Sequence, residues 1–142
     1  MNIKNYLITD FNQYDFVFSK IDPYLCNKCL IFLTGELGSG KTSFIKKFLS
    51  YKYNVSDVTS PTFGIINSYS FNSTYIYHYD LYRIKDSLEL DEIGFYNNLD
   101  IKALHLIEWP EIIPKNIVKP NLSINFETNF EERLISINYI NE

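Results

Sequence analysis

The stretch Leu30–Thr42, which reads LIFLTGELGSGKT, decides the fold that we predict for this chain. Residues 30–34 form the continuous apolar run that is typical of a strand buried on both faces of a sheet. Residues 35–42 match G-x-x-x-x-G-K-[ST] at every fixed position, and residues 43–51 place apolar side chains on one face of a helix. A strand, a glycine-rich loop and a helix in this order predict a phosphate-binding loop of the P-loop type.

The residue types in this loop suit the binding of a nucleotide phosphate. Glycine lets the backbone turn its N–H groups inward and approach phosphate oxygens closely, and the positive end of the following helix points at the same anion. We expect Lys41 to bridge the β- and γ-phosphates and the Thr42 hydroxyl to bind Mg²⁺. The other loop residues expected to contact phosphate are Gly35, Leu37, Gly38, Ser39 and Gly40. The simpler alternative is a glycine-rich turn that only caps a helix.

Two acidic residues are candidates to complete a hydrolytic site. Glu108 follows the apolar run 103–107, so we predict it at the carboxyl edge of the sheet, where it would support the metal directly or through water. The alternative for Glu108 is a surface carboxylate at a strand end. Asp80 lies in the aromatic run 77–83, and we expect it to orient the attacking water or to support the metal from outside its ligands. An ion pair with Arg83 is the structural alternative for Asp80.

Three further residues have a functional and a structural interpretation. Thr62 follows Pro61 in a segment that suits a switch sensing the γ-phosphate, but an ordinary proline-initiated turn would look the same. His78 either contacts a phosphate or is a half-buried imidazole with satisfied hydrogen bonds. Trp109, the single tryptophan, either flanks the nucleotide or a partner, or covers the core.

The remaining pattern predicts an α/β fold, a P-loop NTPase-like three-layer sandwich in a single domain over residues 1–142. Its sheet would be mixed, with a parallel core flanked by antiparallel hairpins. The strands are expected at 4–9, 30–34, 63–71, 74–82, 103–107, 122–126 and 134–140. Helices are expected at 11–20, capped by Asp10, at 43–51, and in a short stretch at 86–94.

Composition and charge narrow the function further. A net charge of −4 and a pI near 5.2 argue against a broad basic surface for nucleic acid, so any contact with RNA is expected to be local or through a partner. No apolar run has the length of a membrane span, and the first residues do not resemble a signal peptide, so we expect a cytoplasmic protein. Cys26 and Cys29 form a lone C-x-x-C, and we expect reduced thiols rather than a zinc site or a redox pair.

The segments GELGSGKTS, SPTFGIINSY, HYDLYRI and LIEWPE, in this order, resemble the bacterial TsaE family over nearly the whole chain. The resemblance implies an ATPase that supports synthesis of N6-threonylcarbamoyladenosine at position 37 of ANN-decoding tRNAs. Such a protein acts with TsaD and TsaB and does not itself modify the tRNA. Glu36, Ser39 and Ser43 replace the family's usual Asp, Ala and Thr, at positions where phosphate binding is not threatened.

The resemblance also implies roles for individual residues of this sequence. Lys41 and the loop amides match the phosphate binders, and Thr42 and Glu108 match the magnesium ligands. Asp80 matches the catalytic acid, Thr62 the switch threonine, and Trp109 the tryptophan beside the metal acid. Arg133 matches an arginine ahead of the last strand, which we expect to contact the nucleotide.

Three other classes of P-loop protein, a small kinase, a GTPase and a non-catalytic ATP-binding module, would have different sequence features. A small nucleoside or nucleotide kinase needs an arginine-bearing lid, and arginine occurs here only at Arg83 and Arg133. A GTPase needs an N-K-x-D segment after the loop, and none is present, which favours ATP. A binding module that holds ATP only as a structural ligand is disfavoured by the two acids.

Overall fold

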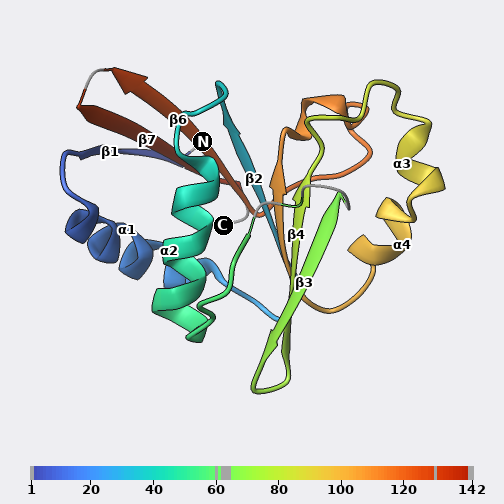
Figure 1. Ribbon diagram of the computed structural model, residues 1–142, viewed down its shortest axis with the longest axis horizontal. Helices are drawn as coiled ribbons and strands as arrows, with labels where there is room; N and C mark the ends of the chain where they lie inside the picture. Colours follow the sequence, from blue (N-terminus) through green and yellow to red (C-terminus); the bar gives the residue numbers. More distant parts are fainter. Residues whose placement is uncertain (1, 60, 62–64, 130, 141–142) are drawn as a thin grey trace.

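One mixed seven-stranded sheet organises the chain in the computed structural model, which describes residues 2–59, 61, 65–129 and 131–140 (Figure 1). The strand order is β1-β7-β6-β2-β5-β4-β3. The four strands β6, β2, β5 and β4 are mutually parallel, while β7 and β1 extend one edge and β3 the other in antiparallel pairing. The strands are β1 (Asn2–Ile8), β2 (Cys29–Gly35), β3 (Ile66–Phe71), β4 (Thr74–Asp80), β5 (Leu104–Glu108), β6 (Leu122–Asn129) and β7 (Glu132–Tyr139). The predicted parallel core with flanking hairpins is confirmed.

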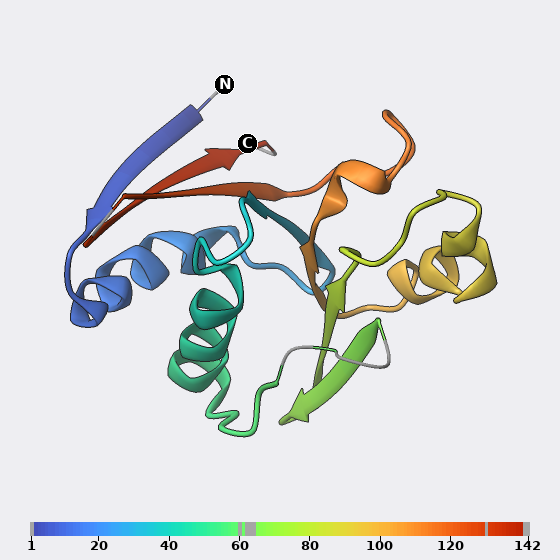
Figure 2. The same ribbon diagram turned by 45° about the horizontal axis from the view of Figure 1, so that its top comes forward.

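Helices cover both faces of the sheet, which gives the three layers that the sequence predicts (Figure 2). The longer helices α1 (Tyr14–Ile21) and α2 (Lys41–Tyr53) pack on one face, and the short helices α3 (Glu89–Glu92) and α4 (Phe95–Leu99) pack on the other. Successive side chains of β5 alternate between these layers, with Leu106 facing the α1–α2 layer and Ile107 the α3–α4 layer. Short 3₁₀ turns complete the fold as η1 (Phe11–Gln13), η2 (Asp22–Tyr24) and η3 (Pro110–Ile112).

Aromatic packing fixes the position of α2 and therefore of the loop that precedes it. The Phe44 ring lies 5.6 Å from Tyr14, 5.3 Å from Phe18 and 5.3 Å from Phe126, measured between ring centroids. Burying one such side chain stabilises the fold by about 1.5–3 kcal/mol. Asp10 caps the first turn of this layer through a reciprocal capping box with Gln13, as expected, although that turn is 3₁₀ rather than α.

The structure corrects the sequence prediction at three places. The helix expected at 86–94 is only the four-residue α3, because the Asp86 carboxylate accepts a hydrogen bond from the Leu88 amide at 3.0 Å and holds a turn there. Helix α4, which begins after Gly94, was not predicted. The C-terminal strands are longer than expected, because their pairing continues through polar residues to Asn129 opposite Glu132.

The two cysteines are free thiols in different surroundings, since Cys26 is exposed and Cys29 is buried in the core. Burial raises the pKa of Cys29 to about 12, so its thiol is unreactive at neutral pH. Among the helices that the structure describes, none has both the length and the apolar character needed to cross a membrane.

Candidate nucleotide-binding site

The glycine-rich loop lies between the carboxyl end of β2 and the start of α2. Gly35, Gly38 and Gly40 adopt φ values of 145°, 78° and 104°, in the left-handed region that favours glycine. A Cβ added at Gly35 would lie 2.7 Å from the carbonyl oxygen of Phe126, so close approach also demands glycine there. The backbone conformation therefore explains why three glycines stand in this loop.

Lys41 occupies the mouth of the loop and is only 5% exposed. Its Nζ donates hydrogen bonds to the carbonyl oxygens of Gly35 and Glu36, and lies 4.2 Å from the centroid of the Trp109 ring. Burial lowers the pKa of Lys41, although the nearby carboxylates, that of Glu108 foremost, raise it in part. A buried ammonium of this kind is stabilised when an anion such as a phosphate approaches it.

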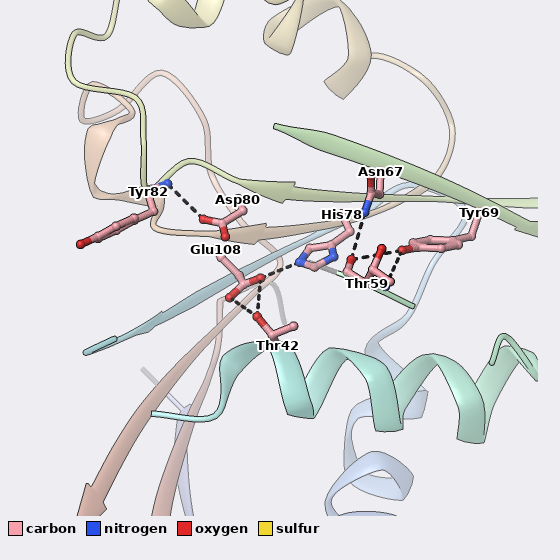
Figure 3. A network of polar contacts seen from close by, with 8 residues as sticks. All are labelled: Thr42, Thr59, Asn67, Tyr69, His78, Asp80, Tyr82 and Glu108. Atoms are coloured by element: carbon pink, nitrogen blue, oxygen red, sulfur yellow. Dashed lines mark hydrogen bonds and ion pairs between the residues drawn. The ribbon is translucent and has the colours of Figure 1, made fainter. Parts of the chain in front are cut away.

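Glu108 ends β5 beside the loop, as the sequence predicts, and its side chain is buried at 2% exposure (Figure 3). The Thr42 hydroxyl donates to its carboxylate, at 3.0 Å from Oε1 and 3.2 Å from Oε2. The alternative of a solvated surface carboxylate is thereby wrong. Hydroxyl and carboxylate oxygens are the ligands that Mg²⁺ prefers in proteins, so this pair fits a magnesium site.

Asp80 lies directly opposite Glu108 in the pairing of β4 with β5, so both predicted acids reach the same edge of the sheet. Its Oδ1 accepts a hydrogen bond from the Tyr82 amide at 3.1 Å, which fixes the carboxylate beside the loop. Burial raises the pKa of Asp80, and the charge of Glu108 adds to the effect, while the Tyr82 hydrogen bond opposes it. A carboxylate with a raised pKa is a stronger base, which suits the acceptance of a proton.

His78 is placed differently from either interpretation that the sequence suggested. It is fully buried rather than half-buried, and its Nε2 lies 2.6 Å from Glu108 Oε2, so its partner is the acid and not a phosphate. Strand periodicity was the available signal, because His78 precedes Asp80 by two residues and therefore shares its face of the sheet. Sequence reasoning missed this contact because it joins two strands.

A cavity of about 270 Å³ brings most of the predicted residues together. Arg133 reaches it from β7, and Trp109 lines it from the end of β5, with its ring centroid 4.9 Å from that of Tyr82. Gly35 lies at the base of the loop outside the lining, and Thr62 lies outside the described residues. The lining is formed by Leu37, Gly38, Ser39, Gly40, Lys41, Thr42, Ser43, Asp80, Tyr82, Glu108, Trp109 and Arg133.

The sheet, the glycine-rich loop ahead of α2 and the acids at the carboxyl edge define a P-loop NTPase-like fold. The family model of the threonylcarbamoyl adenosine biosynthesis protein TsaE matches residues 8–135, and the chain belongs to this family.

Curated relatives carry the same description, tRNA threonylcarbamoyladenosine biosynthesis protein TsaE. The Rickettsia conorii protein is 38% identical over 110 residues, covering 76% of this chain and 62% of its own length. The Borreliella burgdorferi protein is 38% identical over 108 residues, covering 75% of this chain and 78% of its own length. The chain thus spans less than two thirds of the Rickettsia relative. The crystal structure of Bacillus subtilis YdiB shares the fold, with a TM-score of 0.69 and 22% identity over 96% of this chain and 84% of that one.

Proposed function

We propose that this chain is a Mg²⁺-dependent ATPase required for threonylcarbamoyl modification of adenosine 37 in ANN-decoding tRNAs. The observation that carries the proposal is the contact of Thr42 with the buried Glu108 at the mouth of a P-loop, with Asp80 alongside. Phosphate binding alone does not require two carboxylates at this edge of the sheet, whereas metal binding and proton transfer do. The descriptions of the relatives support the tRNA pathway.

The loop residues would bind and orient the triphosphate of ATP. The amides of residues 35–40 and the start of α2 would hold the phosphate oxygens, and Lys41 would exchange its contacts with the loop carbonyls for contacts with the β- and γ-phosphates. Thr42 and Glu108 would hold Mg²⁺, which when bound neutralises charge on the phosphates. These contacts would hold the γ-phosphate next to Asp80.

Hydrolysis then requires one water molecule and a group that accepts its proton. The water oxygen attacks the γ-phosphorus while the bond to the bridging oxygen of ADP breaks, and Asp80 orients the water and takes its proton. The raised pKa of Asp80 and its fixed position suit this role. Lys41 stabilises the negative charge that develops, and the products are ADP and inorganic phosphate. Thr62, as the switch threonine, would report the presence of the γ-phosphate.

Arg133 connects the phosphate cavity with a second cavity of about 360 Å³ that would take the adenine base. The Arg133 guanidinium carbon lies 5.3 Å from the Phe11 ring centroid, and Nη1 donates to the Tyr14 hydroxyl at 3.3 Å. Phe11 is 52% exposed, so its ring offers a face for a base to stack on. The lining of this cavity consists of Ile8, Thr9, Asp10, Phe11, Tyr14, Glu131 and Arg133.

The ATPase would act with proteins of the TsaD and TsaB type in the cytoplasm and would not itself transfer the threonylcarbamoyl group. The acidic chain favours contact with tRNA through these partners rather than directly. Hydrolysis would then reset the complex after each round of modification.

The test is steady-state ATP hydrolysis with Mg²⁺, by the chain alone and with its cognate TsaD–TsaB pair. We expect little activity alone, a clear rise with the partners, and a loss of about 100-fold or more in Lys41→Ala and Glu108→Ala. Lys46→Ala is the matched control, because Lys46 is an exposed lysine of the same helix. Phosphorylation of a nucleoside, with no effect of the partners, would instead identify a small kinase.

A further inference from the structure

The Glu108 carboxylate is held by two different elements of the fold, as Figure 3 shows. Thr42 reaches it from the first turn of α2, and His78 reaches it from β4. The contact with His78 is the shorter, at 2.6 Å, and its two side chains are 0% and 3% exposed. The orientation of the acid is therefore set from inside the protein.

Hydrogen-bond chemistry identifies which nitrogen of His78 carries the hydrogen. A carboxylate that binds Mg²⁺, as proposed for Glu108, is an acceptor only, so in the proposed site Nε2 donates to Glu108 Oε2. His78 Nδ1 is buried and has no hydrogen-bond partner within the described part of the chain. An N–H group buried without an acceptor is rarer and costlier than an unused acceptor, so the tautomer with hydrogen on Nε2 alone fits these surroundings.

Stability alone does not explain a histidine at this position. Ile76, on the same face of β4, and Leu106, which pairs with His78 in β5, are both fully buried apolar residues. A buried polar atom without a partner costs about 1–3 kcal/mol, and an apolar side chain would avoid that cost. Within residues 2–59, 61, 65–129 and 131–140, the hydrogen bond that the histidine gains is the one to Glu108.

We propose that His78 is a positioning residue that holds the Glu108 carboxylate in the orientation needed to bind Mg²⁺ together with Thr42. The proposal rests on the proposed ATPase function. His78 occupies one lone pair of Oε2, so the remaining lone pairs of the carboxylate stay directed toward the Thr42 hydroxyl and the cavity. Groups that orient a metal ligand in this way are typically worth 10- to 100-fold in metal affinity.

Three substitutions separate positioning from packing. His78→Gln keeps a nitrogen donor at the reach of Nε2, His78→Asn moves the donor back to the position of Nδ1, and His78→Phe keeps the ring without a donor. The measurement is the Mg²⁺ concentration that gives half-maximal enhancement of binding of a fluorescent ADP analogue. We expect a rise of about 10-fold or more in His78→Phe and His78→Asn, with recovery toward the wild-type value in His78→Gln.

Two further readouts keep the proposal testable if a variant folds poorly. Long-range ¹H–¹⁵N NMR spectra of the unsubstituted chain should show His78 with hydrogen on Nε2, and thermal unfolding of each variant reports its stability separately. His105→Gln, a second buried histidine away from the cavity, should leave the Mg²⁺ requirement unchanged.

A well-folded His78→Phe with the wild-type Mg²⁺ requirement, or hydrogen found on Nδ1 alone, overturns the positioning role. If the unsubstituted chain instead shows no Mg²⁺-dependent nucleotide binding, the proposed function fails first, and the two failures are distinguishable.

Discussion

His78 and His105 are both fully buried on neighbouring strands of the same sheet, but they face opposite layers. His105 has a partner at each nitrogen, since Nε2 donates to the Ile101 carbonyl oxygen at 2.9 Å and Nδ1 accepts from the Tyr79 hydroxyl at 2.7 Å. Among the residues that the structure describes, His78 has one hydrogen-bond partner, Glu108 at Nε2, and none at Nδ1. The two hydrogen bonds of His105 explain its burial through the fold, whereas the partly unsatisfied His78 beside Glu108 calls for another explanation, which the proposed positioning role provides.

The same contrast extends to the two faces that the histidines occupy. The face toward α1 and α2 carries the glycine-rich loop, and Glu108 and His78 belong to this face. The face toward α3 and α4 carries Tyr79 and His105. Their hydrogen bonds connect β4 with β5, and β5 with the segment that precedes it. Substitution of the polar residues His78 and Asp80 on the first face should therefore affect nucleotide binding or hydrolysis more than stability, and substitution of His105 on the second face should do the reverse.

The largest effect is expected at Asp80. Asp80→Asn removes the proposed proton acceptor, so ATP hydrolysis with the proposed TsaD–TsaB partners should fall by about 100-fold or more. Asp86→Asn is the matched control, because Asp86 also accepts a hydrogen bond from the amide two residues ahead but lies outside the cavity. Asparagine can keep either turn, since its Oδ1 still accepts the amide hydrogen bond. Equal losses in both variants would therefore contradict a specific role of Asp80 as a base.

The pH dependence of stability gives the Asp80 substitution a second readout. Because burial raises the pKa of Asp80 in the folded state, its ionised form destabilises the fold. Below the ordinary pKa of aspartate the penalty is absent, and it is fully present once the pH exceeds the folded-state pKa. Urea unfolding at several pH values should therefore show Asp80→Asn gaining stability relative to the unsubstituted protein as the pH rises. A constant difference would contradict this sign.

The next effect is the loss of stability on replacing a glycine by alanine, which we compare for Gly35 in the glycine-rich loop and Gly94 between α3 and α4. Gly35→Ala places a Cβ 2.7 Å from a backbone oxygen at φ 145°, so we expect a loss of about 1–3 kcal/mol from backbone strain and a similar loss from overpacking. Gly94→Ala, at φ 73° with open space around the new Cβ, should lose only about 1–2 kcal/mol. Urea unfolding measures both. Gly35→Ala alone should also weaken nucleotide binding.

A smaller effect is expected at the satisfied histidine. His105→Phe leaves the Tyr79 hydroxyl and the Ile101 carbonyl without their partner, which should cost about 1–3 kcal/mol in the free energy of unfolding. The Mg²⁺ requirement for nucleotide binding should not move. A change in that requirement would show that the two faces are not independent.

Much of this arrangement follows from local sequence, and the exceptions have physical reasons. The loop and Glu108 were predictable, because a glycine pattern and an apolar strand ending in an acid are continuous in the sequence. The contact of His78 with Glu108 was not predictable, since a hydrogen bond between β4 and β5 depends on strand register rather than on neighbours in the chain. Helix α4 escaped prediction because five residues are too few for a helical period to stand out.

The smallest effect is expected from replacing one of two aromatic rings, Trp109 beside the glycine-rich loop or Tyr77 beside His105. Trp109 lies under the Lys41 ammonium, whereas Tyr77 stacks on His105 with ring centroids 5.5 Å apart. Trp109→Leu removes a cation–π contact worth about 0.5–1 kcal/mol, so affinity for the fluorescent ADP analogue should change by only about 2- to 5-fold. Trp109→Phe keeps an aromatic ring, so its affinity for the ADP analogue should lie between those of Trp109→Leu and the unsubstituted protein. Tyr77→Leu should lower stability by about 0.5–1.5 kcal/mol beyond its lost burial and leave affinity unchanged, because its ring serves the fold.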